Sequence, residues 1–119
     1  MAGVRGINVY GRDIIWVDYD GCKTPEQMIQ IFDEAVDFLM KKNEQSLVLT
    51  SFKNTYLTSP FLRHVEAQAP RVAHLIKRNA FIGMSKPKKM ILKGINQSTK
   101  LNYLAFDSEH EAIEFLLED

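Results

Sequence analysis

Short β-type runs alternate along this chain with segments that repeat apolar residues at helical spacing. The β-type runs are rich in β-branched and aromatic residues and lie at residues 4–10, 14–19, 47–50, 79–84 and 101–106. The helical segments lie at residues 25–43, 60–78, 85–97 and 108–117. The order β-β-α-β-α-β-α-β-α predicts an α/β fold with a mostly parallel central sheet, flanking helices and one antiparallel N-terminal strand.

Three of the expected helices begin at residues that cap helix N-termini. Thr24 and Ser108 are followed three residues later by Gln27 and Glu111, the spacing of a capping box. Ser59 precedes a proline that suits the first helical turn, so we expect Ser59 to cap the second helix.

Two further features predict how the second and third helices are built. Pro70 falls inside the apolar pattern of the second helix and removes a backbone donor, so we expect it to kink or divide that helix. In the third helix, we expect Ser85 to act as the cap. Met90, Ile91 and Ile95 follow helical spacing there and are expected to be buried.

The length and composition indicate one compact domain over residues 1–119. No apolar run approaches the roughly 18 residues that a membrane helix needs, and the N-terminus lacks the apolar segment of a secretory signal. Cys22 is the single cysteine, which rules out an internal disulfide. We therefore expect a cytoplasmic protein with no transmembrane segment.

Basic residues are concentrated in the second half of a chain that is neutral overall, with 15 basic and 15 acidic residues. Between Ala67 and Phe106 there is no Asp or Glu. Eight basic residues occur in this basic run: Arg71, Lys77, Arg78, Lys86, Lys88, Lys89, Lys93 and Lys100. Such segregation predicts a surface that attracts anions or acidic partners.

The basic run contains a sharp turn from an expected strand into an expected helix, where α/β folds bind ligands. The helix start provides four candidate anion-binding residues: Ser85, Lys86, Lys88 and Lys89. Gly83 permits close approach of the backbone to a ligand. The alternative is that Ser85 only caps the helix and that the lysines are solvated. The turn lacks phosphate-loop spacing, so we do not expect nucleotide hydrolysis.

The loop after the third expected strand is the second candidate site, because it follows the carboxyl end of a parallel strand. Its candidate partner-binding residues are Ser51, Phe52, Tyr56 and Ser59. Phe52, Tyr56 and the nearby Phe61 are expected to offer an apolar contact to a partner or ligand. The alternative is that these aromatic side chains fold back onto the core.

Other residue types form no catalytic or metal-binding pattern. His64, His74 and His110 are too scattered for a zinc site. Asp18 and Asp20 are two residues apart, which is compatible with acid–base work, but we prefer to interpret them as a solvated strand end. The aromatic residues do not interleave with the lysines, which argues against nucleic acid as a partner. We expect no metal and no cofactor.

Five short sequence segments resemble those of a known family. They are IWVDYDG at 15–21, SLVLT at 46–50, NAFIG at 79–83, KKMIL at 88–92 and LAFDSEHEAIEFL at 104–116. Their order and spacing are similar to the SpoIIAA-like branch of the STAS superfamily, which includes antagonists of anti-sigma factors and the cytoplasmic tails of sulfate transporters. The resemblance covers about residues 8–118 and implies a STAS-like fold.

The resemblance also bears on function. Signalling members of this family carry a phosphorylated serine in an Asp-Ser-(Ser/Thr)-Gly motif at the start of the helix after the third strand. This chain lacks the motif, although Ser51, Thr55, Thr58 and Ser59 lie in the same region. The resemblance therefore implies the fold more directly than it implies a phosphorylation switch.

The sequence predicts a non-enzymatic regulatory module that binds a protein partner through the loop after the third strand and the helix that follows it. No nucleophile–base pair, metal set or cofactor motif points to an enzyme. The alternative is a binding protein for a small anionic or lipid-like ligand, since distant relatives of the STAS-like fold carry lipids.

Overall fold

The computed structural model describes residues 2–99 and 101–118, so Lys100 of the basic run lies outside the described residues. The strands in this part of the chain are β1 (Gly3–Val9), β2 (Arg12–Asp18), β3 (Ser46–Ser51), β4 (Ile76–Ile82) and β5 (Leu104–Ala105). The helices are α1 (Pro25–Lys42), α2 (Ser59–Gln68), the 3-10 helix η1 (Ala69–Leu75), α3 (Lys86–Thr99) and α4 (Glu109–Leu116). The predicted order of strands and α-helices is confirmed.

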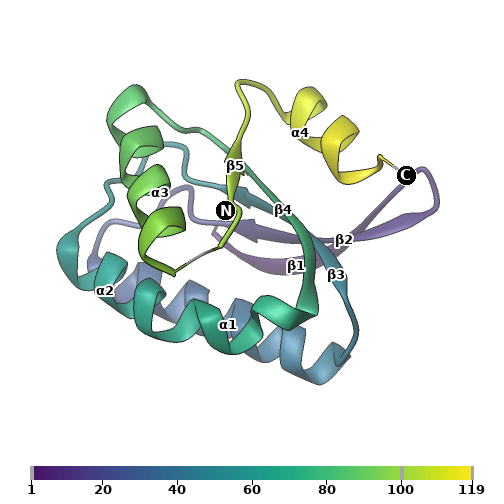
Figure 1. Ribbon diagram of the computed structural model, residues 1–119, viewed down its shortest axis with the longest axis horizontal. Helices are drawn as coiled ribbons and strands as arrows, with labels where there is room; N and C mark the ends of the chain where they lie inside the picture. The colour runs from purple at the N-terminus through teal and green to yellow at the C-terminus, as the bar shows by residue number, and fades with distance from the viewer. Residues whose placement is uncertain (1, 100, 119) are drawn as a thin grey trace.

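The strands form one mixed sheet in the order β1-β2-β3-β4-β5 (Figure 1). β1 pairs with β2 in antiparallel fashion, and each later pair is parallel. The expected, mostly parallel sheet with an antiparallel N-terminal strand is therefore confirmed. Because β2, β3 and β4 run in the same direction, their carboxyl ends meet at one edge of the sheet, where α/β folds bind ligands.

Different helices cover the two faces of the sheet, as Figure 1 shows. On one face, Ile15, Val17 and Val48 pack in a core with residues of α1, α2, η1 and α3. On the other face, Ile14 and Leu49 pack with residues of α4. Alternation along each strand explains this division, since neighbouring strand residues point to opposite faces.

The capping box predicted for the first helix is confirmed, and of the one predicted for the last helix the structure shows the cap at Ser108. Thr24 Oγ1 accepts a hydrogen bond from Gln27 N at 3.1 Å, and Gln27 Oε1 accepts one from Thr24 N at 3.2 Å. Ser108 Oγ accepts a hydrogen bond from Glu111 N at 3.1 Å. These contacts are local, so sequence spacing is sufficient to predict them.

The prediction for the start of α2 is wrong, whereas the prediction for its end is confirmed. Ser59 is the first residue of α2 and Thr58 is its N-cap residue, so the predicted cap at Ser59 is wrong by one position. The Thr58 side chain makes no capping hydrogen bond. Pro70 does divide the segment, because α2 ends before it and the chain continues as the 3-10 helix η1.

The third helix and the last strand differ from their predictions. Met90 is 75% exposed, whereas Leu92 and Ile95 are the buried residues of α3. The helix thus presents a face rotated from the expected one. The predicted strand at 101–106 shrinks to the two residues of β5. The Asn96 side chain binds both Tyr103 N and Tyr103 O at 2.8 Å, which occupies the backbone groups that would have extended that strand.

A close contact between two loops joins the carboxyl ends of β3 and β4. Gly83, directly after β4, has a φ of +74°, and a Cβ added to it would lie 2.6 Å from Lys53 N. Phe52 N donates a hydrogen bond to Ile82 O at 3.1 Å, which continues the pairing past the end of β3. The glycine that was expected to admit a ligand therefore admits the backbone of Lys53.

Gly83→Ala is expected to lower the free energy of unfolding by about 1–3 kcal/mol, because alanine is strained at this φ and its methyl group meets the Lys53 backbone. Gly94→Ala is the matched control, since Gly94 lies in α3 with open space around it and alanine favours a helix by roughly 1 kcal/mol. Urea denaturation measures both values. Equal stability of the two variants would contradict this role of Gly83.

Candidate functional site

The two candidate sites predicted from the sequence meet in one surface groove, here termed the loop–helix groove. It lies between the loop of residues 52–58 and the start of α3, and its volume is about 700 Å³. Its lining residues are Asn54, Thr55, Tyr56, Leu57, Ser85, Pro87, Lys88 and Ile91. The groove therefore combines residues that follow β3 with residues that follow β4.

An aromatic stack sets the position of the loop. Phe52 lies between Tyr19 and Phe81, with ring centroids 4.6 and 5.8 Å away and an interplanar angle of 12° in each contact. Phe61, near the start of α2, packs edge-on against Phe52 at a centroid distance of 6.0 Å. All four side chains are buried. The stack therefore ties the loop to the ends of three strands and to α2.

Hydrogen bonds give the loop a compact turn. Thr55 Oγ1 donates to Phe52 O at 2.7 Å. Asn54 has a left-handed φ of 55° and donates from Nδ2 to Asp20 Oδ1 at 3.2 Å. Asp18 Oδ1 accepts a hydrogen bond from Asp20 N at 2.9 Å, and Asp18 is buried rather than solvated. The two carboxylates thus order the turn after β2 and anchor the loop.

Burial divides the predicted partner-binding residues into two pairs. Tyr56 is 86% exposed, and Ser59 is exposed as well. Ser51 and Phe52 are buried, which corrects the expectation that they face a partner. Phe61 is buried too. The alternative that the aromatic side chains fold back onto the core is therefore correct for Phe52 and Phe61 but not for Tyr56. Phe52 continues the alternation of β3, and this pattern was the signal for its burial.

The protein itself engages two lysines of the predicted anion site. Lys88 Nζ donates to Phe52 O at 2.8 Å and to Gly83 O at 3.4 Å, and burial lowers the pKa of Lys88. Lys89 Nζ donates to Asp107 Oδ1 at 2.8 Å, and this hydrogen bond lowers the pKa of Asp107. Lys88 and Lys89 therefore bridge parts of the fold, and an anion would have to compete with these contacts.

The other two residues of that site, Ser85 and Lys86, are exposed at the start of α3. Ser85 O accepts a hydrogen bond from Lys89 N at 2.9 Å, as expected for a residue that precedes a helix. Lys53 is an exposed cation that sequence reasoning missed, because it lies outside the basic run. Its contact with Gly83 brings it to the same edge of the sheet.

The two arginines of the basic run form hydrogen bonds away from this groove. Arg78 Nη1 donates to Phe115 O at 2.8 Å and to Glu118 O at 2.7 Å, which closes the end of α4. Arg71 Nη1 donates to Gln68 Oε1 at 2.6 Å. Part of the predicted basic surface is therefore used in hydrogen bonds within the fold.

His64 and Cys22 are not among the residues that line the loop–helix groove. His64 Nε2 lies 2.6 Å from Asp33 Oδ1, between α2 and α1. Burial raises the pKa of the Cys22 thiol. Within residues 2–99 and 101–118, no group of three or more His, Cys, Asp or Glu side chains is arranged to hold a metal ion. None of the helices described is long and apolar enough to cross a membrane.

The sequence of this chain matches no protein family and no curated protein with which it was compared. The function of the loop–helix groove is therefore argued from its own geometry and chemistry.

Lys88→Met keeps the apolar part of the side chain and removes the ammonium group that joins the loop to the turn after β4. We expect the variant to lose about 1 kcal/mol of unfolding free energy and its loop amides at 53–58 to exchange hydrogen faster. Lys86→Met is the matched control, because Lys86 is exposed, and its change should stay within about 0.5 kcal/mol. Unaltered amide exchange in Lys88→Met would show that Lys88 does not hold the loop.

Proposed function

We propose that this chain is a non-enzymatic protein-interaction module with a STAS-like fold, and that it binds a partner protein in the loop–helix groove. The observation that carries the proposal is Tyr56, which is 86% exposed and lines a groove of about 700 Å³. Tyrosine combines a large apolar ring with a polar end, and it is enriched among residues that dominate binding energy. Buried contacts hold the loop that carries Tyr56 in place, so the loop loses little conformational freedom when a partner binds.

The order of secondary structure supports the STAS-like part of the proposal. The β-β-α-β-α-β-α-β-α order and the antiparallel first strand agree with what the resemblance implies. One detail of the proposed docking differs from the sequence prediction. The loop after β3 is retained, but its neighbour in the groove is α3 rather than α2.

Charge and lining favour an acidic protein segment as the occupant. Lys53 and Lys86 are exposed at this edge of the sheet, and no Asp or Glu is among the described lining residues. Leu57, Pro87 and Ile91 make the lining partly apolar. A partner segment with carboxylates beside an apolar side chain would complement both properties.

The chemistry of the groove supports binding rather than catalysis. Its described lining contains no histidine or carboxylate that could act as a base beside Ser85. Lys88 is engaged by two carbonyl oxygens and is a poor candidate for a free amine nucleophile. The same engagement weakens the alternative of a small anion held by the lysines of this turn.

Tyr56→Ala is expected to weaken partner binding about 30-fold, the equivalent of about 2 kcal/mol for a central aromatic contact. The partner is first captured from a lysate of the source cells and then purified for titration. Tyr10→Ala is the matched control, since Tyr10 is 92% exposed in the turn between β1 and β2, at the opposite edge of the sheet. Unchanged affinity in Tyr56→Ala, or an equal loss in Tyr10→Ala, would exclude this groove.

Charge reversal tests the proposed chemistry of the partner. Lys53→Glu and Lys86→Glu are expected to slow association and to reduce its dependence on salt, because rim charges act mainly on the association rate. Stopped-flow kinetics at two salt concentrations measures the effect. Faster association in either variant would show that the partner segment is not acidic.

A further inference from the structure

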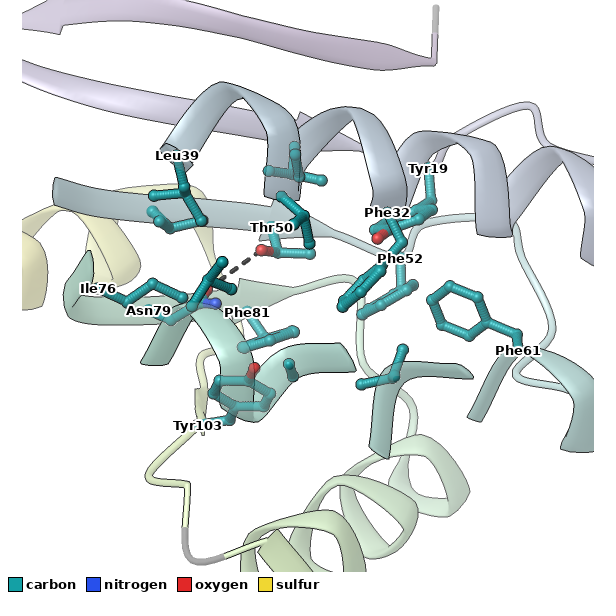
Figure 2. A pocket seen from close by; sticks show the side chains of 17 residues that line it. Tyr19, Phe32, Leu39, Thr50, Phe52, Phe61, Ile76, Asn79, Phe81 and Tyr103 are labelled. Atoms are coloured by element: carbon teal, nitrogen blue, oxygen red, sulfur yellow. Dashed lines mark hydrogen bonds between the residues drawn. The ribbon is translucent and has the colours of Figure 1, made fainter. Parts of the chain in front are cut away.

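A cavity of about 60 Å³ lies in the core between the sheet and the helices α1, α2 and η1 (Figure 2). Most of its lining is apolar, and the polar residues that line it are Tyr19, Thr50, Asn79 and Tyr103. Thr50 Oγ1 donates a hydrogen bond to Asn79 Oδ1 at 3.1 Å, drawn as the dashed line in Figure 2. This hydrogen bond engages the amide oxygen of Asn79, and the amide nitrogen Nδ2 is left as a donor.

Three donors of the lining have no protein partner among the described residues: Asn79 Nδ2 and the hydroxyl groups of Tyr19 and Tyr103. The exposed fractions of Asn79, Tyr19 and Tyr103 are only 8, 2 and 9%. Burial raises the pKa of Tyr103 to about 12 and the pKa of Tyr19 well above its usual value, so both phenols keep their protons. Donors that line a cavity can form hydrogen bonds with a molecule that brings an acceptor into it.

The cavity shares part of its lining with a groove on the surface. Ile76, Asn79 and Tyr103 line both the cavity and a surface groove of about 250 Å³. This second groove exists because β5 pairs only with Ala80 and Phe81, which leaves the amino-terminal half of β4 without a strand neighbour on that side. These three side chains therefore form the border between the second groove and the cavity.

The second groove is basic. Lys77 and Arg78 line it, and none of its described lining residues is acidic. Arg78 is engaged by carbonyl oxygens at the end of α4, whereas Lys77 is exposed. Lys77 is thus the cation that can meet an anion where the groove joins the cavity.

We propose that this junction binds a short-chain carboxylate, with its apolar end in the core cavity and its carboxylate at Asn79, Tyr103 and Lys77. The volume limits the apolar end. A cavity of roughly 150 Å³ admits benzene, and this cavity has about 60 Å³, so only a few carbon atoms fit. The acyl chain of a long lipid is larger than this cavity. Of the lipid-like ligands considered from the sequence, only small acids therefore fit.

The proposal is independent of partner binding at the loop–helix groove. The junction lies along the amino-terminal half of β4, whereas the loop–helix groove lies beyond the carboxyl end of the same strand. If one of the two sites is shown not to bind its proposed ligand, the proposal for the other site is unaffected.

Titration of the isotope-labelled full chain with butyrate tests the proposal by NMR. We expect saturable shifts of the Asn79 side-chain amide and of core methyl groups, with a Kd on the order of 1 mM for so small a ligand. Octanoate, which exceeds the cavity, and 1-butanol, which lacks the charge, should each bind at least about tenfold more weakly. Absence of saturable butyrate shifts, or equal binding of 1-butanol, would overturn the proposal.

Two pairs of variants locate the ends of the ligand. Lys77→Gln should weaken butyrate binding several-fold, whereas Lys93→Gln, an exposed change on α3, should leave it unaltered. Val72→Ile adds a methyl group beside the cavity and should abolish binding, whereas Val9→Ile on the other face of the sheet should not.

Melting temperatures establish that these four variants are folded. Should Val72→Ile fail to fold, Lys77→Gln still decides the position of the carboxylate. Butyrate binding at wild-type strength in Lys77→Gln, or in folded Val72→Ile, would refute the site.

Discussion

The stacking of Phe52 between Tyr19 and Phe81 is the contact on which the carboxyl-terminal edge of the sheet depends. It joins the ends of β2, β3 and β4 through rings that each bury a large apolar surface. With Phe52 fixed, the backbone of Lys53 can rest against Gly83, and the Phe52 carbonyl can receive Lys88. Loss of the stack would release the loop and the start of α3 together.

The same stack separates the two proposed sites. Its three rings line the core cavity on one side and carry the loop of residues 52–58 on the other. The loop–helix groove is wide, exposed and flanked by lysines, which suits a protein segment. The cavity is small, apolar and edged by unpartnered donors, which suits a small acid. One sheet thus offers two chemically different surfaces at the two ends of β4.

Local features of the chain were predictable because they depend on neighbours in sequence. The capping box at Thr24, the cap at Ser108 and the division at Pro70 all involve groups a few residues apart. The prediction of a longer last strand failed because a side chain seven residues away in the sequence binds the backbone there. Asn96 took the hydrogen bonds that would have lengthened β5, and no sequence period reveals such a contact.

The sequence by itself determined the fold class, the caps of the first and last helices and the two segments that supply the loop–helix groove. Only the tertiary structure decided which side chains of those segments face solvent. Phe52 and Tyr56 are both aromatic loop residues, yet packing against three strands buries one and leaves the other exposed. Lys86 and Lys88 are likewise similar in sequence, but a carbonyl oxygen that follows β3 reaches only Lys88. Burial and pairing depend on contacts between distant segments, which are formed only when the chain folds.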